Sequence, residues 1–343
     1  MTIRVGLIGF GVAGRYFHAP LLRAAGFHLV AAVTSRADDV HLIAPGAVVL
    51  DSAEKLLARE DIEMVVIATP TNLHVAQTRA ALNSSKHVVV DKPISADSRD
   101  ARELAELAKQ KDRKLAVFHN RRWDNDFLTL QKLIHEQRLG EINAYHARWD
   151  RYRPQPSAGW RNQAERSSSM LYDLGSHMID QALVLFGRPD WIQADVFKQR
   201  PAALTEDGFE ILMAKGAVRI TLGVSYMASD GGWRYRVHGS KASYLKAQLD
   251  PQEPQARAGI QPEDPQFGVE TKSDWGKLVT GATGVTEIIP SERGHWVSFY
   301  ELMRKSIEND APVPVSGDEA AEVVEIIEAA YESSSEGKRI YLS

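Results

Sequence analysis

The first 120 residues alternate short, β-branched apolar runs with segments of helical periodicity. Residues that favour helix N-termini (Ser52, Thr71 and Asp97) precede three of the helical segments. The predicted strands are Ile3–Ile8, Leu29–Val33, Val48–Leu50, Met64–Thr69, His87–Val90 and Leu115–His119, and the predicted helices are Ala53–Arg59, Asn72–Leu82 and Ser98–Lys111. Strands and helices that alternate at this spacing predict an α/β domain with a doubly wound parallel sheet.

The pattern changes after Asn120. A helix is predicted over Asp126–Arg138, and later runs alternate apolar and polar residues, as in antiparallel strands with one solvated face. These runs are Ile142–Asp150, Trp191–Lys198, Val218–Tyr226 and Trp233–His238; further helices are predicted at Arg293–Glu308 and Asp318–Ser334, a short terminal run at Arg339–Leu342, and loops at Asp250–Phe267 and Thr280–Thr286. We therefore expect a doubly wound α/β domain at 1–120 and an α+β domain at 121–343.

Composition narrows the possible functions. The 343 residues are 44% hydrophobic and 25% charged, and 41 basic against 45 acidic residues give a net charge of −4. These values are typical of a folded globular protein and do not favour nucleic acid as a partner. The absence of cysteine excludes disulfide scaffolds, thiol nucleophiles and cysteine-ligated metals. Because no uncharged run reaches the roughly 18 apolar residues of a membrane span, we expect a cytoplasmic protein without a membrane partner.

A glycine-rich turn follows the first predicted strand. The second glycine lets a pyrophosphate approach the backbone, whereas the first and third allow a tight turn and close packing of helix on strand. The residues of the turn are Gly9, Phe10, Gly11, Val12, Ala13 and Gly14, a complete G-x-G-x-x-G. At this position in a strand–helix–strand unit the motif predicts dinucleotide binding, and the alternative is a purely structural turn.

The residues about twenty positions further on bear on which dinucleotide is bound. An acidic residue there would hold the ribose diol of NAD, but the sequence has Thr34, Ser35 and Arg36. A hydroxyl followed by a guanidinium suits the 2′-phosphate of NADP. NADP is therefore the favoured cofactor. NAD stays possible if Asp38 or Asp39 reaches the ribose instead.

Polar residues also follow the fourth and fifth predicted strands, at the edge where ligands bind in open α/β sheets. The fourth strand leads into Thr69, Pro70, Thr71 and Asn72, of which Thr71 could alternatively cap the next helix. The fifth leads into Asp91, Lys92 and Pro93. We expect Lys92 to face the nicotinamide, and the alternative is a surface lysine.

A further pair of candidates lies in the second domain. A helix predicted from Asp173 through Leu185 places Asp173 and His177 one turn apart on the same face. That face could point into a pocket. Alternatively, Asp173 caps the helix and His177 is a core histidine.

Together these motifs resemble the glucose–fructose oxidoreductase, inositol dehydrogenase and MocA family. The resemblance extends over nearly the whole chain and rests on Gly9–Gly14, Thr69–His74, Val90–Pro93 and Asp173–His177. Within the family, Phe17–Pro20, His119–Asp124 and Asp150–Pro154 look like the branch with NADP-dependent scyllo-inositol dehydrogenases. The resemblance implies a Rossmann domain, a C-terminal domain with a large open antiparallel sheet, and a homodimer or homotetramer formed through that sheet.

The resemblance also implies roles for individual residues. Lys92, Asp173 and His177 would form the catalytic set, with His177 as the base and Lys92 stabilising the reacting oxygen. His74 and Asp91 would join the cofactor contacts, and no metal is needed for hydride transfer. The substrate would be a polyol or sugar, held by Asn120, Arg121, Trp123, Arg151, Tyr152 and Trp160, with His18 as a possible further contact before Pro20 breaks the first helix. The alternatives are a dinucleotide-sensing regulator without catalysis and a dehydrogenase specific for sugar phosphates.

Overall fold

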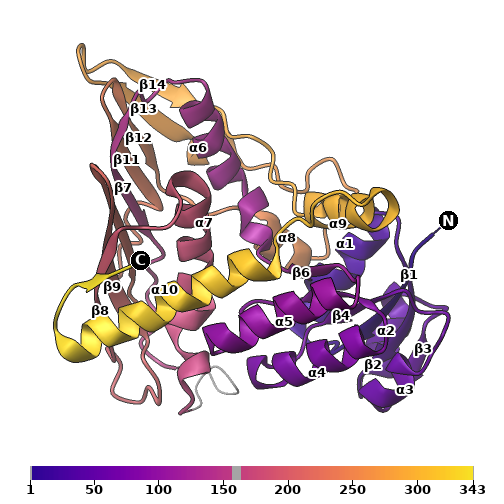
Figure 1. The fold of residues 1–343 in the computed structure, drawn as a ribbon. Coiled ribbons are helices and arrows are strands. Elements are labelled where there is room, and N and C mark those ends of the chain that lie inside the picture. Colours follow the sequence, from indigo (N-terminus) through magenta and orange to yellow (C-terminus); the bar gives the residue numbers. More distant parts are fainter. Residues whose placement is uncertain (1, 157–163, 343) are drawn as a thin grey trace. The chain divides into compact units, whose positions relative to one another are not determined.

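The computed structural model describes residues 2–156 and 164–342, which divide into two compact units (Figure 1). Unit 1 comprises Met1–Trp123, Gln252–Phe267 and His295–Ala321. Unit 2 comprises Asp124–Pro251, Gly268–Gly294 and Glu322–Ser343. The two units are therefore not separated by a single boundary at residue 120, because two later segments of the chain also belong to unit 1.

Unit 1 is built on a six-stranded parallel sheet with the order β3-β2-β1-β4-β5-β6, which confirms the doubly wound α/β prediction. The strands are β1 (Arg4–Ile8), β2 (His28–Val33), β3 (Val48–Leu50), β4 (Met64–Ile67), β5 (His87–Val90) and β6 (Leu115–Val117). The helices are η1 (Gly14–His18), α1 (Ala19–Ala24), α2 (Ala37–Ile43), α3 (Ala53–Leu57), α4 (Thr71–Asn83), α5 (Ser98–Gln110), η2 (Asn120–Trp123), α8 (Gln252–Arg257) and α9 (Val297–Asn309).

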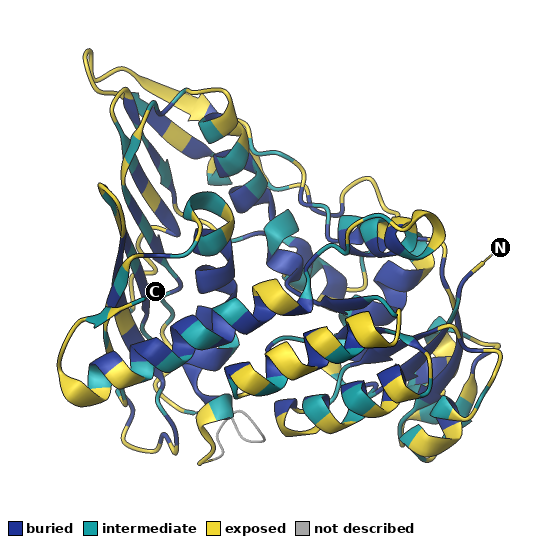
Figure 2. Cartoon of the chain, in the orientation of Figure 1, coloured by how far each residue is buried: buried dark blue, intermediate teal, exposed yellow. Residues whose placement is uncertain are grey.

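Amphipathic helices cover this sheet. In α5, Ala101, Leu104 and Ala108 are buried while the opposite side is exposed, as Figure 2 shows. Asp97 caps the helix because its carboxylate accepts the N–H of Arg99 at 2.8 Å. The apolar spacing and the cap, both readable in the sequence, therefore fix this layer of the fold.

Two local predictions in unit 1 are wrong. Pro20 does not break the first helix, because it lies in the first turn of α1, where a missing N–H is tolerated, and α1 continues to Ala24. The predicted loop Asp250–Phe267 contains α8, whose first turn tolerates Pro254 in the same way. The prolines are N-terminal helix residues in both places rather than loop signals.

Unit 2 contains a nine-stranded sheet with the order β14-β13-β12-β11-β7-β10-β9-β8-β15. The pairing is antiparallel except between β7 and β10, which run parallel, so the sheet is mixed rather than wholly antiparallel. The strands are β7 (Ile142–Arg148), β8 (Trp191–Phe197), β9 (Gly208–Lys215), β10 (Val218–Val224), β11 (Tyr235–Gly239), β12 (Ala242–Lys246), β13 (Gly276–Thr280), β14 (Thr286–Ile289) and β15 (Ile340–Tyr341). The predicted loop Thr280–Thr286 connects β13 to β14 and is confirmed.

Helices pack on one face of this sheet in Figure 1. They are α6 (Asn125–His135), α7 (Ser176–Phe186) and the part of α10 (Gly317–Glu336) that belongs to unit 2; η4 (Arg166–Ser168), η5 (Leu171–Gly175) and η6 (Lys272–Asp274) are single turns. The core between them includes Phe127, Tyr145, Met178, Phe209 and Ile327, all at most 1% exposed. The helix that carries His177 is therefore fixed on a packed sheet.

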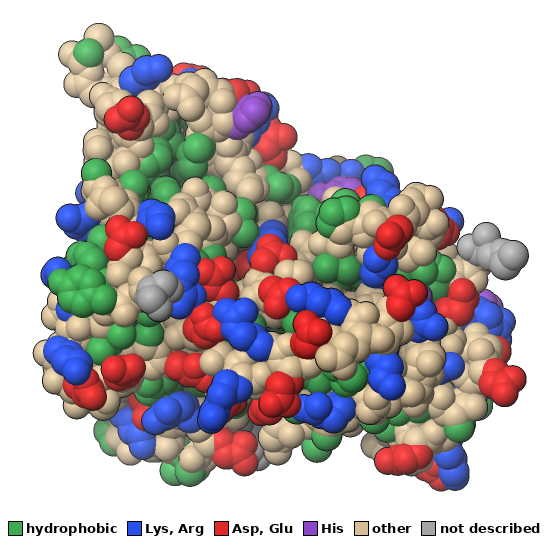
Figure 3. Space-filling model, in the orientation of Figure 1, with side chains coloured by type: hydrophobic (Ala, Val, Ile, Leu, Met, Phe, Trp, Pro, Cys, Tyr) green, Lys and Arg blue, Asp and Glu red, His purple; other side chains and the backbone are tan. Residues whose placement is uncertain are grey.

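The surface is charged but not dominated by one sign. On the face drawn in Figure 3, basic and acidic side chains are interspersed. Two ion pairs of unit 1 illustrate this, Lys109 with Asp318 at 2.9 Å and Arg122 with Glu319 at 2.8 Å. No helix among the described residues is long and apolar enough to cross a membrane.

Candidate active site

The glycine turn has the geometry that each of its glycines predicts. Gly9 has φ +95°, and a Cβ there would lie 2.5 Å from the carbonyl oxygen of Ala68 at the end of β4. A Cβ on Gly14 would collide with the carbonyl oxygen of Gly9. At Gly11, by contrast, a Cβ would meet no atom within 4 Å. The second glycine thus faces the open space that a pyrophosphate needs to approach the backbone, so these residues fit a dinucleotide.

The turn leads directly into a helix. The N–H of Arg15 donates to the carbonyl oxygen of Gly11 at 2.9 Å, and η1 follows from Gly14. Main-chain N–H groups at such a helix start favour an anion.

The residues expected at the ribose lie after β2. Ser35 and Arg36 are exposed, and the main-chain N–H of Arg36 donates to Thr34 Oγ1 at 3.1 Å. Of the two carboxylates on which the NAD alternative depends, Asp39 forms an ion pair with Arg15 at 2.8 Å and Asp38 is exposed. Arg36 therefore offers an accessible guanidinium, whereas the carboxylate of Asp39 already has a cationic partner.

The segment after β4 is tied to the segment after β5 through one side chain. His74 of α4 is 1% exposed, with Nδ1 2.8 Å from the carbonyl oxygen of Pro93 and Nε2 2.8 Å from that of Thr69. A neutral imidazole donates to only one of these acceptors. Burial lowers the pKa of His74, which favours that neutral form. His74 therefore links the segment after β4 to the segment after β5. Its contact with a dinucleotide stays a prediction.

The other residues after β4 have separate roles. Thr69 Oγ1 donates to Gln77 Oε1 at 2.7 Å. Thr71 is the first residue of α4, and Pro70 in the N-cap position provides no side-chain cap, so the prediction that Thr71 caps the helix is wrong. Asn72 is exposed.

Lys92 follows β5, as predicted, and Asp91 fixes its backbone. The main-chain N–H of Lys92 donates to Asp91 Oδ1 at 2.8 Å, and the Lys92–Pro93 peptide is cis. Burial acts to raise the pKa of Asp91, but His18, Lys92 and His74 outweigh it and lower this pKa below its ordinary value. His18 itself is fully buried, so the expectation that it contacts substrate is wrong.

In unit 2, Asp173 and His177 lie on consecutive turns but not on one regular helix. Asp173 belongs to the π-helical turn η5, which begins at Leu171, and α7 begins at Ser176. The main-chain N–H of Asp173 donates to the carbonyl oxygen of Ser169 at 2.9 Å, so Asp173 is inside the helix rather than its cap. His177 is 6% exposed and Asp173 is half-buried. A π-turn often marks a functional site because it redirects side chains from the regular helical face.

The structure brings Tyr226 close to Asp173 and several arginines close to Tyr226. Burial raises the pKa of Tyr226, Asp173 raises it further, and Arg151, Arg153 and Arg200 act in the opposite direction. The Arg200 guanidinium lies 4.7 Å from the centre of the Tyr226 ring and pairs with Asp207. The sequence analysis missed Tyr226 and Arg200, and only their positions next to predicted strands could have indicated them.

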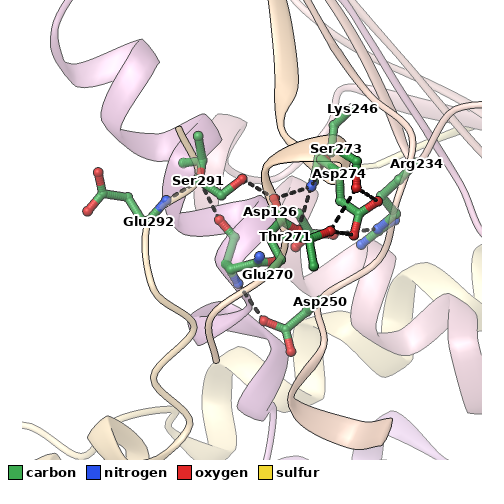
Figure 4. Close-up of polar contacts among 12 residues, drawn as sticks. Asp126, Arg234, Lys246, Asp250, Glu270, Thr271, Ser273, Asp274, Ser291 and Glu292 are labelled. Carbon is green, nitrogen blue, oxygen red and sulfur yellow. Dashed lines mark hydrogen bonds and ion pairs between the residues drawn. The ribbon is translucent and has the colours of Figure 1, made fainter. Parts of the chain in front are cut away.

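A buried polar network anchors α7 one turn beyond His177. Gln181 accepts from Arg234 Nη2 at 2.7 Å and from the Tyr235 hydroxyl at 2.8 Å. Arg234 in turn pairs with Asp126 of α6 at 3.2 Å, and both side chains are at most 1% exposed (Figure 4). This network fixes the position of α7, and therefore of His177, on the sheet.

A second buried ion pair lies beside the first in Figure 4. Lys246 Nζ lies 2.6 Å and 2.7 Å from the two carboxylate oxygens of Glu270, which also accepts the hydroxyl of Ser291. Close by, the main-chain N–H of Asn125 donates to Asp250 at 2.7 Å. These contacts tie the loops on both sides of β13 and β14 to the sheet and to the start of α6.

The predicted substrate residues belong to both units. In unit 1, Asn120 and Arg121 are buried in η2, Arg121 pairs with Glu253 at 2.7 Å, and Trp123 packs edge-to-face on Phe299. In unit 2, the guanidinium of Arg151 lies 5.4 Å from the centre of the Trp149 ring. Tyr152 is 59% exposed, and its backbone forms an isolated antiparallel β-bridge with Met227. Trp160 lies outside the described residues. No group of three or more His, Asp or Glu in the described ranges could hold a metal ion.

Comparison with known proteins gives matches along the whole chain. Residues 3–119 match the model of the NAD-binding Rossmann fold of an oxidoreductase family, and residues 131–342 match its C-terminal α/β domain. The scyllo-inositol 2-dehydrogenase (NADP(+)) IolW of Bacillus subtilis is 40% identical over 99% of this chain and 96% of its own length. The uncharacterized oxidoreductase YdgJ of Escherichia coli is 38% identical over 97% and 96%. The structure of the oxidoreductase yvaA from Bacillus subtilis covers 100% of this chain and 99% of its own, with a TM-score of 0.97 and 40% identity.

Proposed function

The chain belongs to the glucose–fructose oxidoreductase, inositol dehydrogenase and MocA family of oxidoreductases, and from this premise we propose that it transfers hydride between NADP and a secondary alcohol or ketone of an inositol-like polyol. The observation that carries the substrate class is the similarity, over 99% of the chain, to an NADP-dependent scyllo-inositol dehydrogenase. The observation that supports a dinucleotide cofactor is the open space beside Gly11.

The residues around the glycine turn would hold the dinucleotide. Main-chain N–H groups from Gly9 to Gly14 would bind the pyrophosphate, and Ser35 and Arg36 would bind the 2′-phosphate. When bound, NADP supplies the hydride acceptor of alcohol oxidation, and NADPH the donor of ketone reduction. The pairing of Asp39 with Arg15 supports NADP over NAD, because it engages one of the two carboxylates that could bind a ribose diol.

The proposed chemistry assigns one role to each of three residues. In alcohol oxidation, His177 takes the proton of the hydroxyl group while hydride leaves the carbon that bears this hydroxyl. In ketone reduction, His177 gives a proton to the carbonyl oxygen. Lys92 donates a hydrogen bond to the reacting oxygen and stabilises its developing negative charge. Asp173 orients the substrate hydroxyls. Its negative charge also offsets part of the positive charge of the arginines near Tyr226.

A second substrate class has support from one observation. Arg151 and Arg153 act on Tyr226, which lies close to Asp173, whereas the buried Arg200 already pairs with Asp207. Two guanidinium groups at this place suit a phosphate or carboxylate. A phosphorylated or carboxylated polyol is therefore the second candidate substrate.

Initial rates with a small substrate panel separate these candidates. The protein is assayed with NADP and NAD against scyllo-inositol, myo-inositol, glucose and glucose 6-phosphate, and in reverse with scyllo-inosose. The proposal expects NADP-linked turnover with an inositol and a higher kcat/KM than for the sugars. A preference of more than about tenfold for the phosphorylated sugar, removed by Arg151→Ala, supports the second candidate. Nucleotide binding without turnover of any substrate supports a sensor.

We also propose that the protein forms a homodimer or homotetramer through the face of the nine-stranded sheet opposite α6 and α7. Residues alternate across each strand, so Trp191 and Arg219 point to the face opposite the buried Ile192 and Ile220. Arg339 lies 3.7 Å from the centre of the Trp191 ring. Sedimentation of the wild-type protein and of Trp191→Glu tests this, since the charged variant should shift the protein toward a monomer.

A further inference from the structure

A chain of three polar side chains lies directly behind Lys92 in unit 1. It joins three elements that are distant in sequence, η1, the end of β5 and α9, through His18, Asp91 and Tyr300. The inference drawn from it rests on the proposed catalytic role of Lys92.

The contacts run in one direction, from α9 to the backbone of Lys92. The Tyr300 hydroxyl lies 2.7 Å from His18 Nδ1, and His18 Nε2 lies 3.7 Å from Asp91 Oδ2. The other carboxylate oxygen of Asp91 accepts the main-chain N–H of Lys92 at 2.8 Å. Tyr300 and His18 therefore lie within hydrogen-bond distance, whereas His18 and Asp91 are in electrostatic contact without a hydrogen bond.

The side chains of His18 and Tyr300 cannot reach a ligand. His18 and Tyr300 are both fully buried, and the ring of Phe118 lies 4.3 Å from the centre of the His18 imidazole. Because neither side chain is accessible, neither can touch substrate, and any effect on the reaction must pass through Asp91.

The charge of Asp91 fixes the proton on His18. At 3.7 Å this contact is longer than a hydrogen bond, and His18 Nε2 has no hydrogen-bond partner among the described residues. A nitrogen lone pair would be repelled by the carboxylate that it faces, so we expect Nε2 to carry hydrogen. In neutral His18 this leaves Nδ1 as an acceptor for the Tyr300 O–H; in charged His18, Nδ1–H donates to the same hydroxyl oxygen. Burial raises the pKa of Tyr300 well above its ordinary value, so the hydroxyl stays protonated and serves both states.

We propose that Tyr300 and His18 are positioning residues for Lys92: the phenol fixes the imidazole, the imidazole holds the Asp91 carboxylate, and the carboxylate fixes the backbone that aims the lysine side chain. The ionisable groups that surround Asp91 are His18 from η1, Lys92 itself, His74 from α4 and Tyr300 from α9. Asp91 is thus the point at which the surrounding elements of unit 1 act on one lysine.

Nuclear magnetic resonance of the histidine rings tests the arrangement in the free protein, without substrate or cofactor. With ¹⁵N-labelled histidine, the His18 signals are assigned by their loss in His18→Gln. We expect Nε2 to carry hydrogen in the wild-type protein at neutral pH. In Asp91→Asn the carboxamide can present its NH₂ to His18, so the hydrogen should move to Nδ1, with Tyr300 turning from donor to acceptor. Wild-type protein with hydrogen only on Nδ1, or no change in Asp91→Asn, would overturn the proposal.

Kinetics test whether the chain acts on Lys92. Tyr300→Phe removes a single oxygen, and His18→Asn removes the donor that faces Asp91, whereas His18→Gln replaces that donor with an amide N–H at a similar reach. Since a small displacement of a reacting group can cost up to about a hundredfold, we expect Tyr300→Phe and His18→Asn to lower kcat about tenfold to a hundredfold, with an unchanged KM for NADP. His18→Gln should recover most of the loss.

His87→Gln is the matched control, because His87 begins β5, whereas Asp91 directly follows the opposite end of that strand. This variant should keep kcat within about twofold of wild type, since it touches none of the reacting groups. If Tyr300→Phe and His18→Asn also keep wild-type kcat while Lys92→Ala does not, the positioning role is wrong and the proposed function stands. If Lys92→Ala keeps full activity, both are wrong.

Discussion

The carboxylate of Asp39 lies 2.8 Å from the guanidinium of Arg15. Both residues follow a strand of the parallel sheet, Arg15 in η1 and Asp39 in α2. The pair engages one of the two acids that could hold the ribose diol of NAD, and the exposed Arg36 can meet a 2′-phosphate. The proposed preference for NADP therefore rests on two arginines with different tasks.

Arg36→Ala should weaken NADPH binding by about 1–3 kcal/mol, the range for a charge-assisted hydrogen bond, and leave NADH binding unchanged. Calorimetric titration with both nucleotides measures this. Arg99→Ala, at an exposed position in α5, serves as the control and should alter neither affinity. An equal loss for NADPH and NADH in Arg36→Ala would show that Arg36 does not read the 2′-phosphate.

Lys92→Ala and His177→Ala should each lower kcat by at least about a hundredfold, because each removes a group that the proposed function assigns to the reacting oxygen. The affinity for NADPH should stay nearly unchanged, as nucleotide fluorescence titration can show. Exposed residues of the same types, Lys111 and His135, provide the alanine controls. Normal turnover in His177→Ala would mean that another group is the base.

Asp126→Ala should lower the free energy of unfolding by about 3–5 kcal/mol, because it leaves the fully buried Arg234 without its ionic partner. Glu292→Ala breaks the exposed pair with Lys132 and should cost much less, because solvent screens this pair. Denaturant unfolding of the two variants gives the comparison. Similar losses in both would contradict the assignment of the Arg234 network as the anchor of α7.

The stability of the protein should fall with acid partly through His87. Burial, assisted by Arg113 and Lys114, lowers the pKa of His87 from 6.5 to about 4, and Nδ1 accepts the N–H of Lys114 at 3.0 Å, which requires the neutral ring. A base with a lowered pKa in the folded state contributes stability above its unfolded pKa, and this is lost as the pH falls toward the folded pKa.

Between pH 6.5 and 4, His87 should therefore account for a loss of up to about 3 kcal/mol, at 1.36 kcal/mol per pKa unit. His87→Asn keeps an acceptor near the Lys114 N–H but does not titrate, so its stability should decrease less over the same interval. Parallel pH dependences of wild type and His87→Asn would disprove this contribution.

Several features of the fold are readable from the sequence because local signals determine them. The glycine turn, the parallel strands of unit 1 and the helix that Asp97 begins all depend on residues within a few positions of one another. β9 is different: Ile211, Leu212 and Met213 are apolar in succession, so no alternation marks the strand, and its pairing with β8 and β10 decides its structure.

The supporting residues of the site could not be predicted for a related reason. His18 stands in a motif that suggested a substrate contact, yet it is buried against Tyr300, which lies 282 residues away in the sequence. Arg234 likewise follows an exposed segment but turns inward to Asp126 and Gln181. Such contacts depend on the three-dimensional fold, and the sequence shows only the chemistry of their members.

Transfer of deuterium tests the central claim most directly. The protein is supplied with scyllo-inosose and NADPH that carries deuterium at the transferable C4 position of the nicotinamide, and the product is examined by mass spectrometry. We predict an inositol that contains one deuterium on carbon, formed by the wild-type protein and not by Lys92→Ala or His177→Ala. An unlabelled inositol, or no inositol from the wild-type protein under conditions where NADPH is bound, would contradict the account.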